Sequence, residues 1–214
     1  MIILAHRGLW KSKDKRNSIT ALQAAFAAGF GIETDIRDYC GALVISHDIG
    51  SKDSPPLERV LEAYRATGAR APLALNVKAD GIQALLSEQL RKYGIDNYFM
   101  FDMSVPEQVV YIKEGFHTFG RQSEFEQAVP MYKNVEGVWM DEFSQPWITD
   151  EIIAEHLRCG KRVGIISSEI HGNSADRLWG MLEQFRDDQR LMLCTDMPLK
   201  AKEYFYEKDK GNSV

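Results

Sequence analysis

The sequence predicts an α/β fold, a small (β/α)8 barrel in which eight parallel strands alternate with helices. Eight short apolar runs are each followed by a segment with helical spacing, which is the alternation that a closed parallel barrel requires. Polar side chains follow almost every run, and functional groups of such a barrel collect at the carboxyl ends of its strands. An open doubly wound sheet is the competing fold. The sequence has neither a G-x-G-x-x-G after the first strand nor a P-loop motif, which argues against the main nucleotide-binding forms of that sheet.

Length and composition predict one soluble domain. A chain of 214 residues with 44% apolar content suffices for one core and is short for two, so we expect residues 1–214 to form a single domain. About 250 residues is usual for this barrel, so the loops must be short. The net charge of -5 argues against a nucleic-acid partner. Three widely spaced cysteines suggest neither disulfides nor a zinc site. Without a leader or a long apolar run, we expect a cytoplasmic protein with no membrane insertion, and the oligomeric state stays open.

The amino-terminal quarter predicts a strand, a helix and a hairpin. Asn17 or Ser18 is a suitable N-cap for an alanine-rich helix, and Gly29 ends that helix. The short return strand after the second strand departs from strict alternation of strand and helix. The predicted segments are strand 2–5, helix 18–28, strand 31–39 and return strand 42–47.

The rest of the chain continues the alternation. Apolar residues recur with a period near 3.6 in the helical segments, as at Leu57, Val60, Leu61 and Tyr64. A weak helix is expected after Ser123, and the tail is expected to fray. The predicted segments are helix 57–67, strand 73–77, helix 82–93, strand 98–101, helix 105–114, strand 117–120, strand 137–140, helix 149–159, strand 162–166, helix 174–188, strand 191–194, a charged helix from 199 to about 208, and the tail 208–214.

The second strand carries two acidic residues on one face. Side chains alternate along a strand, so Glu33 and Asp35 share a face and lie about 6 to 7 Å apart. Two such carboxylates repel each other unless a cation or a basic group lies between them. Oxygen ligands favour Mg²⁺ or Ca²⁺, and also Mn²⁺, over a thiophilic metal. A wet, charged face of an edge strand is the alternative for an isolated E-x-D.

The motifs around this pair resemble those of a known family. HRG at 6–8 follows the first strand, Asn17-Ser18 follows ten residues on, E-x-D stands at 33–35, and His47-Asp48 follows the return strand. In this order they resemble the glycerophosphodiester phosphodiesterase family, whose fold is a TIM barrel. The resemblance continues weakly through Lys78 and the TDMP at 195–198. It implies a metal-dependent phosphodiesterase that hydrolyses a small glycerophosphodiester-like substrate to an alcohol and a phosphomonoester, in keeping with lipid metabolism.

Each residue of this set has a chemical role that it could fill. His6 and His47 carry imidazoles, which can both accept and donate a proton, and they are the expected catalytic acid and base, acting with water or with a substrate hydroxyl. Arg7 and Lys78 supply positive charge to a phosphate. Asp48 either ligates the metal, orients a histidine or caps a turn. Asn17 is expected to cap the helix or to support the acidic pair.

Two departures from the family's pattern affect the expected function. Where the family has Glu-x-Lys after the third strand, this chain has Asn76-Val77-Lys78. An amide oxygen can bind a hard cation, so Asn76 is an expected metal ligand, but the site loses one negative charge and we expect weaker metal binding. The alternative is a non-catalytic or altered-chemistry barrel that binds a phosphorylated polyol or sugar.

The second departure concerns the strand at 162–166. The residues after it replace an aromatic-rich segment of the family with Glu169 and His171, which could contact a polar substrate head group. They could equally be a helix cap and a surface histidine. Near the strand at 137–140, Trp139 offers an aromatic wall or a core residue, and Asp141 with Glu142 offers carboxylates for hydroxyl recognition.

Overall fold

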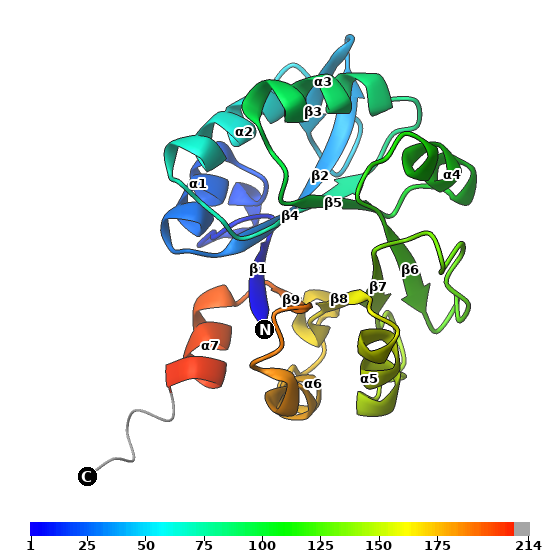
Figure 1. The fold of residues 1–214 in the computed structure, drawn as a ribbon. Coiled ribbons are helices and arrows are strands. Elements are labelled where there is room, and N and C mark those ends of the chain that lie inside the picture. The colour runs from blue at the N-terminus through cyan, green and yellow to red at the C-terminus, as the bar shows by residue number, and fades with distance from the viewer. Residues whose placement is uncertain (208–214) are drawn as a thin grey trace.

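The computed structural model describes residues 1–207, which form a nearly closed barrel of eight parallel strands (Figure 1). Hydrogen-bonded ladders run in the order β5-β4-β2-β1-β9-β8-β7-β6. Between β5 and β6 a single bridge, Met100 to Thr118, marks the seam. This arrangement confirms the predicted (β/α)8 TIM barrel. The barrel strands are β1 Ile2–His6, β2 Gly31–Tyr39, β4 Leu73–Val77, β5 Tyr98–Phe101, β6 Phe119–Ser123, β7 Gly137–Asp141, β8 Arg162–Ile166 and β9 Leu191–Thr195.

Helices surround the barrel, as Figure 1 shows. The predicted hairpin is confirmed, because β3 (Ala42–Ile45) pairs antiparallel with β2. Side-chain caps begin several helices: Ser18, Ser104 and Thr149 each accept a backbone N–H three residues on. No helix among residues 1–207 combines the length and apolar content needed to cross a bilayer. The helices are α1 Ile19–Ala27, α2 Leu57–Ala66, α3 Gln83–Tyr93, α4 Val105–Lys113, α5 Asp150–Arg158, α6 Asp176–Leu182 and α7 Pro198–Lys202, and the 3-10 and π segments are Lys13–Lys15, Ser168–His171, Glu183–Phe185 and Glu203–Glu207.

Three sequence predictions need correction. The strand predicted at 117–120 is β6 at Phe119–Ser123, because its polar second half faces the carboxyl end of the barrel, where Arg121 pairs with Asp102. The weak helix expected after Ser123 is absent from residues 124–136, which form turns: Ser123 and Glu126 exchange backbone hydrogen bonds. The helix predicted at 174–188 ends early, at α6 and a 3-10 turn. The predicted tail at 208–214 lies outside the described residues.

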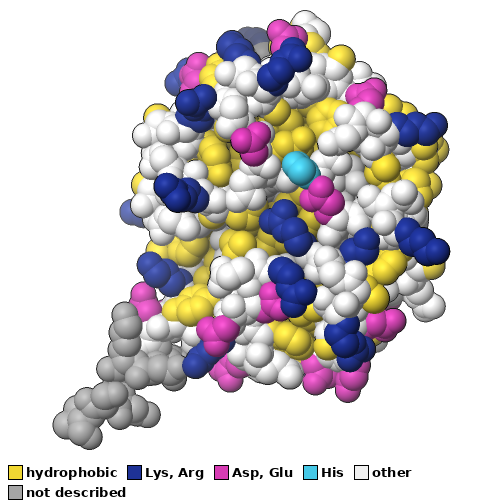
Figure 2. Space-filling model, viewed as in Figure 1, with side chains coloured by type: hydrophobic (Ala, Val, Ile, Leu, Met, Phe, Trp, Pro, Cys, Tyr) yellow, Lys and Arg dark blue, Asp and Glu magenta, His cyan; other side chains and the backbone are white. Residues whose placement is uncertain are grey.

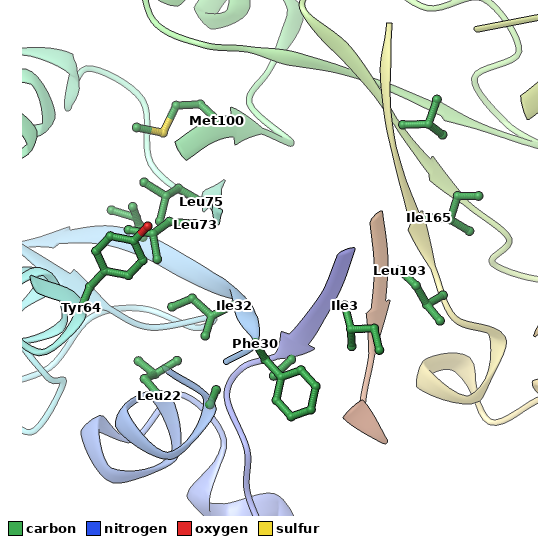
Figure 3. Close-up of a cluster of buried hydrophobic side chains, with 14 of the residues drawn as sticks. Ile3, Leu22, Phe30, Ile32, Tyr64, Leu73, Leu75, Met100, Ile165 and Leu193 are labelled. Carbon is green, nitrogen blue, oxygen red and sulfur yellow. The ribbon is translucent and has the colours of Figure 1, made fainter. Parts of the chain in front are cut away.

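The strands have apolar side chains on both faces, so the barrel has two cores. The outer core lies between sheet and helices, and Figure 3 shows part of it, including Ile3, Ile32 and Leu73. The inner core fills the barrel and is rich in aromatic residues: Phe101 lies 4.1 Å from Trp139, ring centroid to centroid. The inner core therefore forms an apolar floor beneath the polar groups at the carboxyl ends of the strands.

The opposite end of the barrel is closed by apolar and basic side chains. In Figures 1 and 2 the amino-terminal ends of the strands face the viewer, and Figure 2 shows hydrophobic side chains near the centre with basic ones across them. The guanidinium of Arg162 lies over the rings of Phe99 and Phe119, at 5.7 and 5.6 Å from their centroids. His117 belongs to this end and pairs with Glu136.

The inner core predicts the effect of one glycine substitution. A Cβ added at Gly164 would lie 2.4 Å from Cε3 of Trp139, so the indole must move. We expect Gly164→Ala to lower the free energy of unfolding by about 1 to 3 kcal/mol, the usual cost of overpacking, in denaturant titrations. Gly180→Ala in α6 is the matched control: its Cβ would meet open space, and a gain of up to about 1 kcal/mol is expected. Equal losses in both variants would contradict this account.

Candidate active site

A cavity of about 250 Å³ opens at the carboxyl ends of the strands, above the aromatic floor. A larger cavity, of about 550 Å³, has neither a carboxylate nor a histidine in its lining, and one of about 340 Å³ that includes His117 lies at the opposite end of the barrel. A groove of about 510 Å³ adjoins the smaller cavity and shares Arg7, Arg16 and His47 with it. Chemistry therefore favours the smaller cavity, whose lining is His6, Arg7, Arg16, Glu33, His47, Asn76, Phe101, Asp102, Trp139, Asp141, Ile166, Ile170 and His171.

The first loop reaches this cavity because the chain turns sharply after β1. Arg7 and Gly8 have φ values of 55° and 92°, in the left-handed region. A Cβ at Gly8 would lie 2.7 Å from the carbonyl carbon of Ala21, so only glycine fits against the start of α1. The turn places His6 and Arg7 at the cavity from consecutive positions.

His6 is buried and held in a defined orientation. Its Nδ1 lies 2.6 Å from Oδ1 of Asp196, the residue that follows β9. Because a carboxylate only accepts hydrogen bonds, Nδ1 carries the proton and Nε2 is left as a base. Nε2 lies 3.7 Å from Oε2 of Glu33. Burial alone would raise the pKa of Asp196, but the hydrogen bond from His6 and the charge of Arg16 hold that pKa below its ordinary value.

His47 borders the same cavity from the rim. Its side chain is 50% exposed, and Nδ1 lies 3.0 Å from Oδ1 of Asp48. The Asp48 side chain is 94% exposed and is not part of the cavity lining. Three roles were considered for Asp48. Its contact with His47 agrees with the role of orienting that histidine. Its exposed side chain is less suited to share a metal ion with the buried Glu33 and Asp35.

The acidic pair lies deep beneath these groups. Glu33 and Asp35 are 2% and 0% exposed. In the sheet, Glu33 of β2 is paired with His6 of β1, and Asp35 is paired with Asn76 of β4. Burial, and then repulsion by Asp35, raises the pKa of Glu33 to about 7. Asp35 has basic neighbours: Nε of Arg7 lies 3.0 Å from Oδ2, and Nζ of Lys78 lies 3.7 Å from Oδ1. The negative charges of Glu33 and Asp35 are therefore only partly offset by these basic side chains.

Asn17 supports this pair rather than capping a helix. Ser18 provides the cap of α1, while the Asn17 amide donates to Oδ2 of Asp35 at 2.9 Å. Its carbonyl oxygen accepts from the hydroxyl of Thr34 at 2.8 Å. Both ends of the amide are therefore used to fix the second strand's acidic face.

Three of the expected metal ligands have unsatisfied oxygens. Oε2 of Glu33, Oδ1 of Asp35 and Oδ1 of Asn76 are buried and have no hydrogen-bond partner. Buried polar atoms normally have partners, so three orphans at one place indicate a missing cation or donor. No group of three or more His, Cys, Asp or Glu side chains within residues 1–207 has the spacing of a metal site. The donor set is thus two carboxylates and an amide, which suits a hard cation.

The two residues expected to bind a head group differ in position. His171 lines the cavity, and its Nε2 lies 2.7 Å from Oδ1 of Asp141, which raises the pKa of the imidazole. Glu169 instead accepts from the Thr195 hydroxyl at 2.5 Å and from the Asp196 backbone N–H at 3.1 Å, and it does not line the cavity. Of the pair, only His171 faces a ligand-sized space.

Several residues that line the cavity or contact its lining had no role assigned from the sequence. Asp196 holds His6, Arg16 holds Asp196, and Asp102 contacts Asn76. Asp102 and Asp196 lie at strand ends, where polar residues are expected. Their neighbours in sequence do not indicate which residues of other strands they contact. Glu142, expected near the cavity, pairs with Arg177 outside it.

Three solved structures with a similar fold are described as phosphodiesterases. A candidate glycerophosphodiester phosphodiesterase from Galdieria sulphuraria matches with a TM-score of 0.78 and 16% identity over 95% of this chain and 97% of that one. An Oleispira antarctica phosphodiesterase, in complex with the product sn-glycerol-3-phosphate, matches with a TM-score of 0.70 and 14% identity over 95% of this chain and 96% of that one. A glycerophosphodiester phosphodiesterase from Agrobacterium tumefaciens matches with a TM-score of 0.66 and 16% identity over 99% of this chain and 100% of that one. No protein-family profile and no curated protein matches the sequence. The likeness confirms the TIM-barrel fold, which this chain shares with these phosphodiesterases.

The orphan oxygens predict stabilisation by a divalent cation. Mg²⁺, Ca²⁺ or Mn²⁺ at about 100 times its Kd should stabilise the protein by about 2.7 kcal/mol, seen as a higher Tm than in EDTA. Glu33→Gln should abolish this shift and raise the Tm in EDTA, because it removes a buried charge. Glu88→Gln, on the exposed side of α3, should leave both values unchanged. A shift that survives Glu33→Gln would place the cation elsewhere.

Proposed function

We propose that this chain is a metal-dependent phosphodiesterase that hydrolyses small glycerophosphodiester-like substrates to an alcohol and a phosphomonoester. The observation that carries the proposal is that His6, His47, Arg7 and Glu33 line one cavity, with Asp35 buried beside it and paired in the sheet with Asn76 of the lining. Each group alone has ordinary structural explanations. Together they supply the acid, the base and the anion-binding charge that phosphodiester hydrolysis needs.

The metal would be held by Glu33, Asp35 and Asn76. Their unpartnered oxygens are hard donors, which favours Mg²⁺, Ca²⁺ or Mn²⁺. Bound there, a divalent cation supplies positive charge against the phosphate oxygens. Asp48 is left out of this ligand set because of its exposure, and it serves to orient His47.

Positive side chains of the chain itself bind the phosphate. Arg7 lines the cavity and can present two N–H groups to one phosphate. Lys78 lies between Asp35 and Asp102, 3.7 and 3.4 Å from their oxygens, so it offsets the acidic charge and favours an anionic ligand. The cavity of about 250 Å³ suits a phosphoglycerol-sized group, in keeping with the product bound to the Oleispira antarctica neighbour.

The two histidines divide the proton transfers. His6, with Nδ1 bonded to Asp196, takes the proton of the attacking hydroxyl, from water or from the substrate, on Nε2 as the new P–O bond forms. His47 borders both the cavity and the adjoining groove, so it gives its proton to the alkoxide that leaves into that groove. His171, bonded to Asp141, lies where it can contact a hydroxyl of the substrate.

One observation favours a second candidate function. Asn76 takes the place of a third carboxylate, so the same barrel could bind a phosphorylated polyol or sugar without cleaving it. Binding of glycerol phosphate with no turnover of any diester under Mg²⁺, Ca²⁺ or Mn²⁺ would favour that candidate.

Loss of either histidine should abolish most turnover. We expect His6→Ala and His47→Ala each to lower kcat on glycerophosphocholine or a synthetic diester by about 10² to 10⁴, the usual contribution of acid–base catalysis. His117→Ala, at the opposite end of the barrel, is the control and should leave kcat unchanged. Full activity in His6→Ala would reject the assignment.

Asp196 should act through His6. We expect Asp196→Asn to lower kcat by about 10-fold or more with little change in KM, because an amide can donate to Nδ1 and so stabilise the wrong tautomer. The pH–rate profile should shift as well, since the acidic partner of the base is lost. An unchanged profile together with an unchanged kcat would show that Asp196 only holds β9 in place.

A further inference from the structure

The metal-ligand set contains one residue whose orientation is not fixed by its own chemistry. A carboxylate presents oxygen whichever way it turns, whereas the amide of Asn76 has an oxygen at one end and a donor at the other. Only the oxygen can bind a cation. Asn76 stands beside Asp35 in the ladder between β2 and β4, so its amide orientation decides whether that position contributes a ligand.

Asp102 fixes this orientation. Nδ2 of Asn76 donates to Oδ2 of Asp102 at 3.2 Å, and Oδ1 of Asn76 is left buried without a partner. Turning the amide over would set its oxygen against the carboxylate, with loss of the hydrogen bond and repulsion in its place. The contact therefore makes the oxygen the end that is free to receive a cation.

The position of Asp102 is itself well supported. Asp102 follows β5 directly, and its φ of 70° lies in the left-handed region, which aspartate adopts more readily than most residues. Its Oδ1 accepts from NH1 of Arg121 at 2.9 Å, and Oδ2 lies 3.4 Å from Nζ of Lys78. Each carboxylate oxygen is thus anchored, and Asp102 also lines the cavity.

We propose that Asp102 is the positioning residue that turns the oxygen of Asn76 toward the cation and returns to the site the negative charge that an asparagine at this position lacks. The inference rests on the proposed metal site of the proposed function. It assigns no direct metal bond to Asp102. The charge that a carboxylate at position 76 would carry is instead placed on the neighbouring strand, behind the amide.

The test measures metal affinity by calorimetry, without substrate. Asp102→Asn should weaken binding of Mg²⁺, Ca²⁺ or Mn²⁺ about 10- to 100-fold, as loss of an outer partner of a ligand does. Adding Asn76→Asp to that variant should restore affinity to within a few-fold of the parent protein, because a carboxylate needs no orientation. This rescue separates positioning from a merely structural role, which the second substitution would not repair.

Two matched variants sharpen the result. Asp141→Asn removes the same charge from the same cavity without touching Asn76, so it should weaken binding less than Asp102→Asn does. In an Asn76→Leu background, which has no amide to orient, Asp102→Asn should cause little further loss. If Asp102→Asn does not fold, as judged by circular dichroism in EDTA, the Asn76→Asp/Asp102→Asn protein, which keeps the total charge, carries the test.

The outcomes separate the inference from the function it rests on. A parent protein that binds no divalent cation would overturn the proposed metal site, and the inference with it. A parent that binds the cation, with Asp102→Asn binding equally well, would overturn the inference alone. Failure of Asn76→Asp to rescue binding would do the same.

Discussion

The carboxyl end of the barrel is organised around one constraint: Glu33 and Asp35 are buried together on one face of one strand. Neither side chain reaches bulk water, and burial, followed by repulsion from Asp35, raises the pKa of Glu33 to about 7. Basic and amide side chains around the pair partly offset its negative charge. Arg7 and Lys78 contact Asp35, and Asn17 ties it to the first loop. Arg7 and Asn17 contact Oδ2 of Asp35, whereas Oδ1 of Asp35 and Oε2 of Glu33 have no hydrogen-bond partner.

The barrel tolerates this arrangement because its packing is strong elsewhere. Apolar side chains fill the interior below the pair, and glycines at 137 and 164 make room for Phe119 and Trp139. Helices cover the outer face of the sheet. The strands thus have little freedom to move the two carboxylates apart, and in the proposed function a bound cation offsets their negative charge.

The sequence predicted most of the fold but only part of the site. Seven of the barrel strands contain apolar runs that mark them. The prediction for β6 began two residues and ended three residues too early, because Arg121 and Gln122 break the apolar pattern where the strand reaches the cavity. The E-x-D alternation predicted that Glu33 and Asp35 share a face, since that depends on neighbours in sequence. Asp196 and Asp102 could not be assigned, because each acts on a residue of another strand and the pairing exists only after the barrel closes.

The same closure decides how the site forms. Arg7, Asn17 and Asp35 lie within 30 residues of one another, so the acidic pair gains its first partners locally. The contact between His6 and Asp196 joins positions 190 residues apart, from the first and last strands, and β1 pairs with β9 beside it. The orientation of His6 therefore depends on the completed barrel, whereas the charge of the acidic pair is already present in the first two strands. A chain that loses its last strand would keep the acidic pair and its local partners but not an oriented base. In the proposed mechanism, the orientation of the catalytic base therefore depends on barrel closure through the hydrogen bond between His6 and Asp196.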